Sequence, residues 1–86
     1  MAFAGLLVVA LVIDGKGRIA ADPVVLGEGM PEPVEEAVLK AVMATIDGNK
    51  RSDPDDLAEN VRRAARRAAH DAWGKKPVTR VLVTEL

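Results

Sequence analysis

Residues 3–13 have the sequence Phe-Ala-Gly-Leu-Leu-Val-Val-Ala-Leu-Val-Ile, an uninterrupted apolar run. Its β-branched and aliphatic side chains predict a β-strand, and the run is too short to cross a bilayer as a helix. Side chains alternate between the two faces of a strand, so this strand has two apolar sets. One face carries Leu6, Val8, Ala10 and Val12, and the other carries Leu7, Val9, Leu11 and Ile13. A strand that is apolar on both faces is expected where both faces are buried.

The composition of the 86-residue chain fits a single small folded domain. Apolar residues make up 49% and charged residues 29%, a balance typical of globular proteins rather than of disordered chains. Phe3 and Trp73 are the aromatic residues, so the core must be aliphatic. The absence of cysteine excludes disulfides and thiolate chemistry, and no basic segment of a signal peptide precedes the first strand. We expect a cytoplasmic domain, without a membrane segment, that is a piece of a longer protein.

Turn residues predict two further strands. The Asp-Gly-Lys-Gly sequence at 14–17 is a hairpin signal. A return strand is expected over residues 18–21, resuming at 24–26 beyond Pro23, which confines it to a sheet edge or a bulge. The last strand is expected over Val78–Leu86.

Two helices are predicted between the second and the last strand. The first begins near Glu32 or Pro33 and ends at Gly48, which we assign to the residue after the helix. The second is capped by Ser52 or Asp53 and begins at Pro54, which suits a first helical position. It ends at Gly74. Its predicted buried stripe is mostly alanine and consists of Leu57, Val61, Ala64, Ala65, Ala68, Ala69 and Ala72.

The predicted fold class is an α/β (α+β) two-layer sandwich with the element order β-β-α-α-β. Two antiparallel helices cover one face of a three-stranded mixed sheet, whose first and last strands run parallel. The order of the strands in the sheet stays open.

This fold leaves one apolar face of the first strand without a cover from within the chain. We expect another copy or the remainder of a longer protein to cover it, since large apolar patches usually mark interfaces. Apolar residues of the first helix extend the candidate interface, which comprises Leu7, Val9, Leu11, Leu39, Met43 and Ile46. The alternative is a set of scattered surface apolar residues that needs no partner.

Charge is distributed unevenly along the chain. The net charge of −1 argues against a generally basic nucleic-acid binder, and no DNA contact is expected. Residues 60–80 nevertheless hold seven Lys and Arg residues and one acid, Asp71. Phosphates of RNA are candidate ligands for Arg62, Arg63, Arg66, Arg67, Lys75 and Lys76, with Trp73 as a stacking surface. The alternative is a solvated helix face partly neutralised by Glu59 and Asp71, which is the usual role of charge runs on helices.

No set of residues in the chain is sufficient for catalysis or metal binding. There is one histidine, His70, and no cysteine or tyrosine, so nucleophilic triads and zinc clusters have too few members. Asp53, Asp55 and Asp56 stand where a helix begins, and capping explains them better than a metal site does. We therefore predict no catalytic, cofactor-binding or metal-binding residue in this chain.

The sequence resembles the C-terminal domain of bacterial ribonuclease J over essentially its whole length. The most specific part is Trp73-Gly74-Lys75-Lys76-Pro77-Val78, preceded by the arginine-rich helix from Val61. The opening strand into the Asp-Gly-Lys-Gly turn, and Asp22-Pro23 followed by Val25-Leu26-Gly27, also match. The resemblance implies a parent enzyme with a metallo-β-lactamase core and a β-CASP insertion. Such an enzyme cleaves RNA with two zinc or manganese ions, as a 5′-to-3′ exonuclease and as an endonuclease, in the cytoplasm.

The His-x-His-x-Asp-His metal motif of that family has no counterpart here, so no catalytic residue is carried over. The resemblance implies that residues 1–86 form one non-catalytic accessory domain, the catalytic domains lying elsewhere. Its expected role is oligomerisation, or docking to the parent catalytic domains, that supports RNA cleavage. The alternative is an RNA-contacting module that uses the basic helix. A free-standing RNA binder of the KH type is disfavoured, because residues 47–51 lack the Gly-x-x-Gly clamp.

Overall fold

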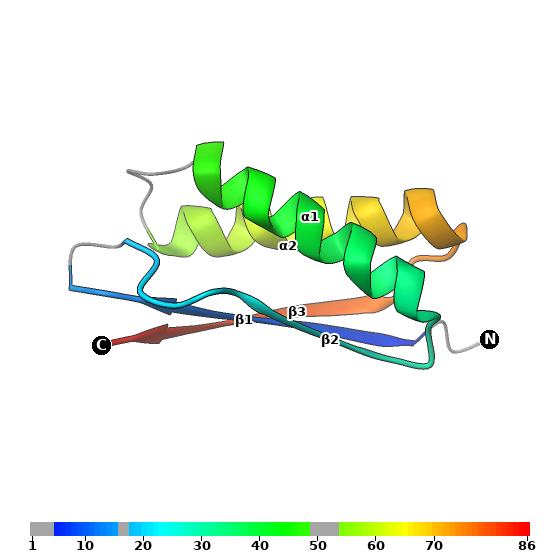
Figure 1. Ribbon diagram of the computed structural model, residues 1–86, viewed down its shortest axis with the longest axis horizontal. Helices are drawn as coiled ribbons and strands as arrows, with labels where there is room; N and C mark the ends of the chain where they lie inside the picture. Colours follow the sequence, from blue (N-terminus) through cyan, green and yellow to red (C-terminus); the bar gives the residue numbers. More distant parts are fainter. Residues whose placement is uncertain (1–4, 16–17, 49–53) are drawn as a thin grey trace.

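The computed structural model describes residues 5–15, 18–48 and 54–86. The elements in chain order are β1 (Leu6–Ile13), β2 (Val24–Glu28), α1 (Glu32–Gly48), α2 (Pro54–Trp73) and β3 (Val78–Glu85). The two helices run antiparallel and cover one face of the sheet (Figure 1). The predicted β-β-α-α-β order and two-layer architecture are thus confirmed.

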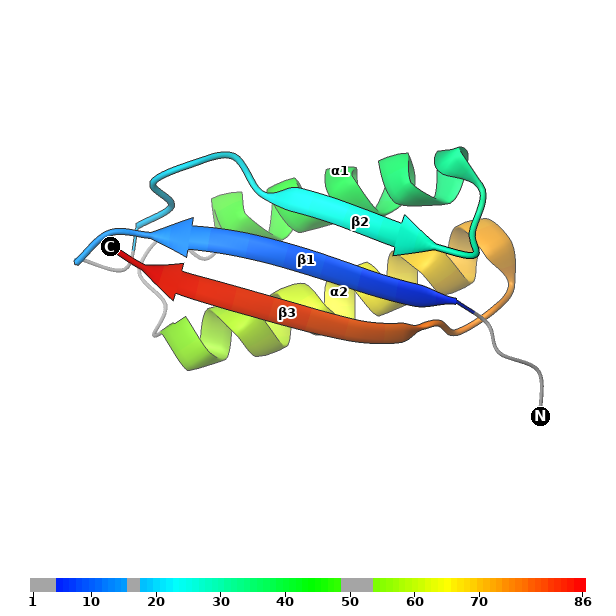
Figure 2. The ribbon, with the colours of Figure 1, turned by 90° about the horizontal axis from the view of Figure 1, so that it is seen from below.

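β1 is the central strand, and the sheet order is β2-β1-β3 (Figure 2). It pairs antiparallel with β2, from Leu6 opposite Glu28 to Ala10 opposite Val24. It pairs parallel with β3 along its whole length, as predicted for the first and last strands. A central strand has no free edge and lies farthest from solvent, which is why the most apolar run of the chain occupies this place.

The core lies between β1 and the two helices and is aliphatic, as the composition predicts. Alternate residues of β1 point into it and are at most 1% exposed. The helices contribute Val34, Val38 and Val42 from α1 and Leu57, Val61, Ala65 and Ala69 from α2. The predicted α2 stripe is too wide, since Ala64 and Ala68 are half-buried and Ala72 is exposed. In α2 the fully buried positions recur once per turn, four residues apart.

The segment after β1 differs from the predicted return strand. Residues 18–21 form no strand; instead, Ile19 makes an isolated antiparallel bridge with Ile13, and the Ala20 N–H donates to the Val12 carbonyl at 2.8 Å. The second strand begins only at Val24, directly after Pro23, because proline has no N–H for a sheet ladder. Part of the predicted turn, Lys16 and Gly17, lies outside the described residues.

The C-terminal end of α2 agrees with the prediction at Gly74, whereas the C-terminal end of α1 differs from it at Gly48. Gly74 has a φ of 75°, and its N–H donates to the His70 carbonyl at 2.7 Å, which closes the last turn of α2. Gly48 is the last residue of α1 and does not adopt a positive φ, so its predicted position after the helix is wrong. The predicted caps of α2, Ser52 and Asp53, lie outside the described residues. No helix in the described part of the chain is long and apolar enough to cross a membrane.

The location of the core predicts how much truncation of a leucine on each face of the sheet lowers the free energy of unfolding. Leu11 is 1% exposed beneath the helices, and Leu82 is 57% exposed on the opposite face. Leu11→Ala is expected to lower the free energy of unfolding by about 2–5 kcal/mol, because it leaves a cavity. Leu82→Ala is expected to lower it by about 1 kcal/mol or less. Urea denaturation of the monomer followed by circular dichroism measures both, and equal losses would contradict the assignment of the core.

Candidate functional site: the open sheet face and the basic helix

Figure 2 shows the face of the sheet that turns away from the helices. Four of the six large hydrophobic side chains exposed among the described residues lie on this face, namely Val24, Leu26, Val78 and Leu82. We call it the open sheet face. Its residues are Leu6, Val8, Ala10 and Val12 of β1, Val24, Leu26 and Glu28 of β2, and Val78, Arg80, Leu82 and Thr84 of β3. The β1 members are half-buried by their neighbours, whereas Leu26 is 61% exposed.

Strand register places these side chains in rows across the sheet. One row is Leu26, Val8 and Arg80, and the next is Val24, Ala10 and Leu82. Side chains directly opposite on neighbouring strands lie about 5 Å apart and contact each other, so the rows form one continuous patch. Contiguous exposed apolar patches on soluble domains usually mark interfaces.

The interface predicted from the sequence named the wrong set of β1 residues. Leu7, Val9 and Leu11 are buried beneath the helices, with exposed fractions of 0%, 0% and 1%, and cannot meet a partner. The helices cover this set because its larger side chains fill the space between the layers. The residues of β1 that lie on the open sheet face are the other set, Leu6, Val8, Ala10 and Val12.

Of the three α1 residues predicted to belong to the interface, only Met43 is exposed. Ile46 packs against the core, and Leu39 is half-buried. Met43 is exposed, but α1 lies in the other layer, so Met43 is not part of the open sheet face (Figure 1). The sheet and the helix layer therefore present separate surfaces.

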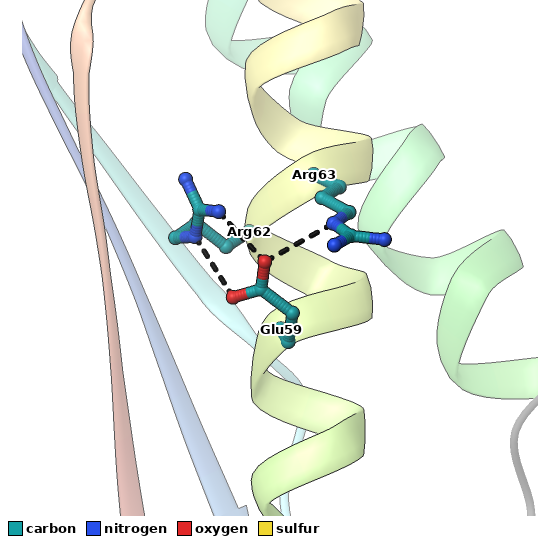
Figure 3. Close-up of polar contacts among 3 residues, drawn as sticks. All are labelled: Glu59, Arg62 and Arg63. Carbon is teal, nitrogen blue, oxygen red and sulfur yellow. Dashed lines mark hydrogen bonds and ion pairs between the residues drawn. The ribbon is translucent and has the colours of Figure 1, made fainter.

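Two of the candidate RNA-contacting arginines are held by one carboxylate (Figure 3). Arg62 donates from Nη2 to Glu59 Oε1 at 2.7 Å and from Nε to Glu59 Oε2 at 3.1 Å. Arg63 Nε also donates to Glu59 Oε1 at 3.1 Å. The hydrogen bonds and charge of Arg62, with a contribution from Arg63, lower the pKa of the Glu59 carboxyl. The same carboxylate raises the pKa of the Arg62 guanidinium.

The remaining basic candidates lie toward the C-terminal end of α2 and beyond it. Arg66 and Arg67 are exposed and form no ion pair with any residue in the described part of the chain. Lys75 places its Nζ 4.7 Å from the centroid of the Trp73 ring, a cation–π contact, and Lys76 is exposed. The six predicted residues thus divide into a pair held by Glu59 and a group without that carboxylate.

A shallow groove of about 340 Å³ between α2 and the edge of β3 was not predicted from the sequence. It is lined by Asp55, Ala58, Glu59, Arg62, Thr79, Arg80, Val81 and Leu82. Its lining comes from two elements that are far apart in the chain, so no local pattern indicated it. The described residues bring no three His, Cys, Asp or Glu side chains close enough to hold a metal ion. His70 is exposed, and Asp53 lies outside the described residues.

The Glu59 contacts predict a small pH dependence of stability. A carboxyl whose pKa is lower in the folded state stabilises the fold above its unfolded pKa, and this contribution is lost as pH falls through the folded value. Glu59→Gln is therefore expected to lower Tm slightly near neutral pH and to match the unmodified chain below about pH 3. Glu36→Gln, at an exposed α1 carboxylate, is the matched control. Thermal melts between about pH 7 and pH 3 measure this difference, and a constant difference would contradict it.

Comparison with known proteins agrees with the resemblance seen in the sequence. The family model described as "Ribonuclease J C-terminal domain" matches residues 1–86. Ribonuclease J of Sinorhizobium meliloti (strain Sm2011 / Rm2011 / 2011) is 35% identical over 95 residues, a match that covers 100% of this chain and 17% of that protein. The chain thus spans 17% of the length of this curated relative. It belongs to the ribonuclease J C-terminal domain family.

Proposed function

We propose that this chain is the non-catalytic C-terminal domain of a larger ribonuclease J-type enzyme, and that it mediates assembly of that enzyme. The family match over residues 1–86 and the relative named Ribonuclease J support this assignment. The match covers only a small part of that relative, so we assign RNA cleavage and its metal ions to the remainder of the longer protein. The domain then supports cleavage by oligomerisation or by docking.

The open sheet face carries this proposal. Six large hydrophobic side chains are exposed among the described residues, and four of them lie on this face: Val24, Leu26, Val78 and Leu82. Scattered surface residues would be distributed over both layers, so this concentration favours an interface. Burial of apolar surface contributes about 25 cal/mol per Å², which makes covering this face favourable.

A second candidate function is contact with RNA through the exposed arginines of α2. Arg66 and Arg67 present guanidinium groups that no described carboxylate neutralises, and guanidinium groups bind phosphates well. Glu59 competes with phosphate for Arg62 and Arg63. We therefore centre this proposal on Arg66 and Arg67, with Lys75 and Lys76 nearby in sequence.

The assembly proposal predicts the effect of a charge on the open sheet face. Leu26→Glu is expected to weaken association of the chain at least tenfold, since a carboxylate would have to be buried. Met43→Glu is the matched control, because Met43 is exposed in the helix layer. Sedimentation equilibrium over a range of concentrations measures association, which should persist in about 0.5 M salt because apolar contacts are not screened.

Equal association of the two variants would contradict the choice of face. A chain that stays monomeric at about 1 mM and also fails to bind a separately supplied nuclease portion would contradict assembly altogether.

The RNA proposal predicts a different sensitivity. A chain carrying Arg66→Glu and Arg67→Glu is expected to lose at least tenfold in affinity for a labelled single strand of about 15 nucleotides. A chain carrying Arg18→Glu and Lys40→Glu has the same net charge and is the control. Fluorescence anisotropy in about 50 mM salt measures binding, which should fall steeply with added salt. Absence of binding at high micromolar protein would exclude RNA contact by this domain.

A further inference from the structure

We infer that the free edge of β3 binds an extended segment of a partner protein as a fourth strand, and that this segment carries an acidic residue beside Arg80 with apolar residues on either side. The inference goes beyond the proposed assembly function, because it uses the edge of the sheet and the groove between α2 and β3. It adds a second binding surface and the chemistry of its partner.

Alternate residues of β3 turn their backbone N–H and C=O groups away from the sheet. β3 is the last strand in the order β2-β1-β3, so only one of its edges is paired. The Val78 N–H donates to the Gly5 carbonyl at 3.1 Å, and the Leu86 N–H donates to the Ile13 carbonyl at 2.9 Å, both on the β1 side. Because the direction alternates along a strand, the residues whose groups point outward are Thr79, Val81, Val83 and Glu85. No backbone hydrogen bond among the described residues reaches these outward groups.

β3 lacks the features that usually protect an edge strand from pairing. It has eight residues without a proline, and each of them pairs one-to-one with a residue of β1, so no bulge interrupts the strand. The other edge strand, β2, has five residues and directly follows Pro23. The β2 edge is therefore protected, and the β3 edge can accept another strand.

The groove between α2 and β3 lies along this edge and has room for side chains of an added strand, with a volume of about 340 Å³. Ala58 lines it from α2 and Val81 lines it from β3. Val81 packs against the core but is only half-buried, because no strand flanks β3 on this side. Figure 3 shows Arg62, another lining residue, bound to Glu59. The lining holds two acidic residues and two arginines, so side chains that enter the groove need no charge.

Arg80 determines the charge that the partner needs on the opposite side of the strand. It lies between Val78 and Leu82 along that side, and all three side chains are exposed. Arg80 forms no ion pair within residues 5–15, 18–48 and 54–86. Opposite charges on neighbouring strands stabilise their pairing, as do contacts between apolar side chains. The matching segment therefore has an acidic residue with an apolar residue two positions before it and another two positions after it.

A second copy of this chain matches the edge less well. β3 of a second copy would bring Val78, Arg80, Leu82 and Thr84 to this side, a set without an acidic residue. β2 of a second copy carries Glu28, but a contact between β2 and β3 does not close and continues into a filament. We therefore assign the edge to a segment of another protein.

A titration with a designed peptide tests the inference. The probe is a blocked peptide of about nine residues that alternates valine and threonine around one central glutamate. NMR spectra of the labelled chain are expected to give a dissociation constant of roughly 0.1–1 mM. The amides of Thr79, Val81 and Val83 are expected to exchange more slowly with solvent, because they donate to the added strand. The same peptide with N-methyl groups on alternate residues is the control, since it cannot complete the ladder.

A charge exchange tests the role of Arg80. Arg80→Glu is expected to weaken binding of the glutamate peptide about tenfold, because an attractive pair becomes repulsive. The same variant is expected to bind a peptide with a central lysine more tightly than the unmodified chain does. Arg67→Glu, at an exposed helix position, is the matched control. Circular dichroism verifies that both variants are folded.

The outcomes are distinguishable. Absence of binding by either peptide overturns the inference, and Arg80 then protects the edge from pairing. Slow exchange of the same amides in the chain alone, increasing with its concentration, would also overturn it, because a second copy would then occupy the edge. Val24→Lys, on the open sheet face, is expected to weaken assembly and to leave peptide binding unchanged. The proposed function and this inference can therefore fail separately.

Discussion

The structure depends on how the apolar strand β1 is covered. β3 pairs with one edge along its whole length, and β2 pairs with the other from Leu6 to Ala10, beyond which Ile19 makes an isolated bridge with Ile13. These pairings satisfy most of its backbone groups without water. The helices α1 and α2 cover one of its faces, and Val38, Val42 and Val61 are fully buried there. The other face receives only the flanking side chains of the same sheet and stays half-exposed. An 86-residue chain buries a modest fraction of its surface, and two helices supply only one covering layer.

Local patterns in the sequence were sufficient for the order of the elements and for the helix end at Gly74, because turn and cap chemistry involves residues close in the chain. They did not indicate which side of β1 faces the helices. Both alternating sets of its side chains are apolar and have the same spacing. Side-chain volume was a usable signal. The buried set includes Leu7, Leu11 and Ile13, whereas the open set includes Ala10. The polar residues of β3 give a second signal, but only once the strand register is known.

The arginines of α2 show the same limit of prediction from local sequence, this time for charged residues. Helical spacing places Arg62 and Arg66 one turn apart, as it does Arg63 and Arg67, which predicts one compact cationic patch. The same spacing places Glu59 three and four residues before Arg62 and Arg63, where it binds both. Spacing alone could have indicated these pairs. It could not show that no carboxylate of the described residues pairs with Arg66 or Arg67, because this depends on the packing of the elements against one another.

The proposed assembly surface and the proposed RNA-contacting arginines lie in opposite layers of the molecule, so the two proposed functions would not compete for surface. The open sheet face lies on one side, and the exposed arginines belong to α2 in the layer on the other side (Figure 1). If a partner covers the open sheet face, Arg66 and Arg67 in the helix layer stay accessible to solvent. A partner bound to α2 would leave the open sheet face uncovered. Only a contact on the sheet side would cover the open sheet face, whatever the helices bind.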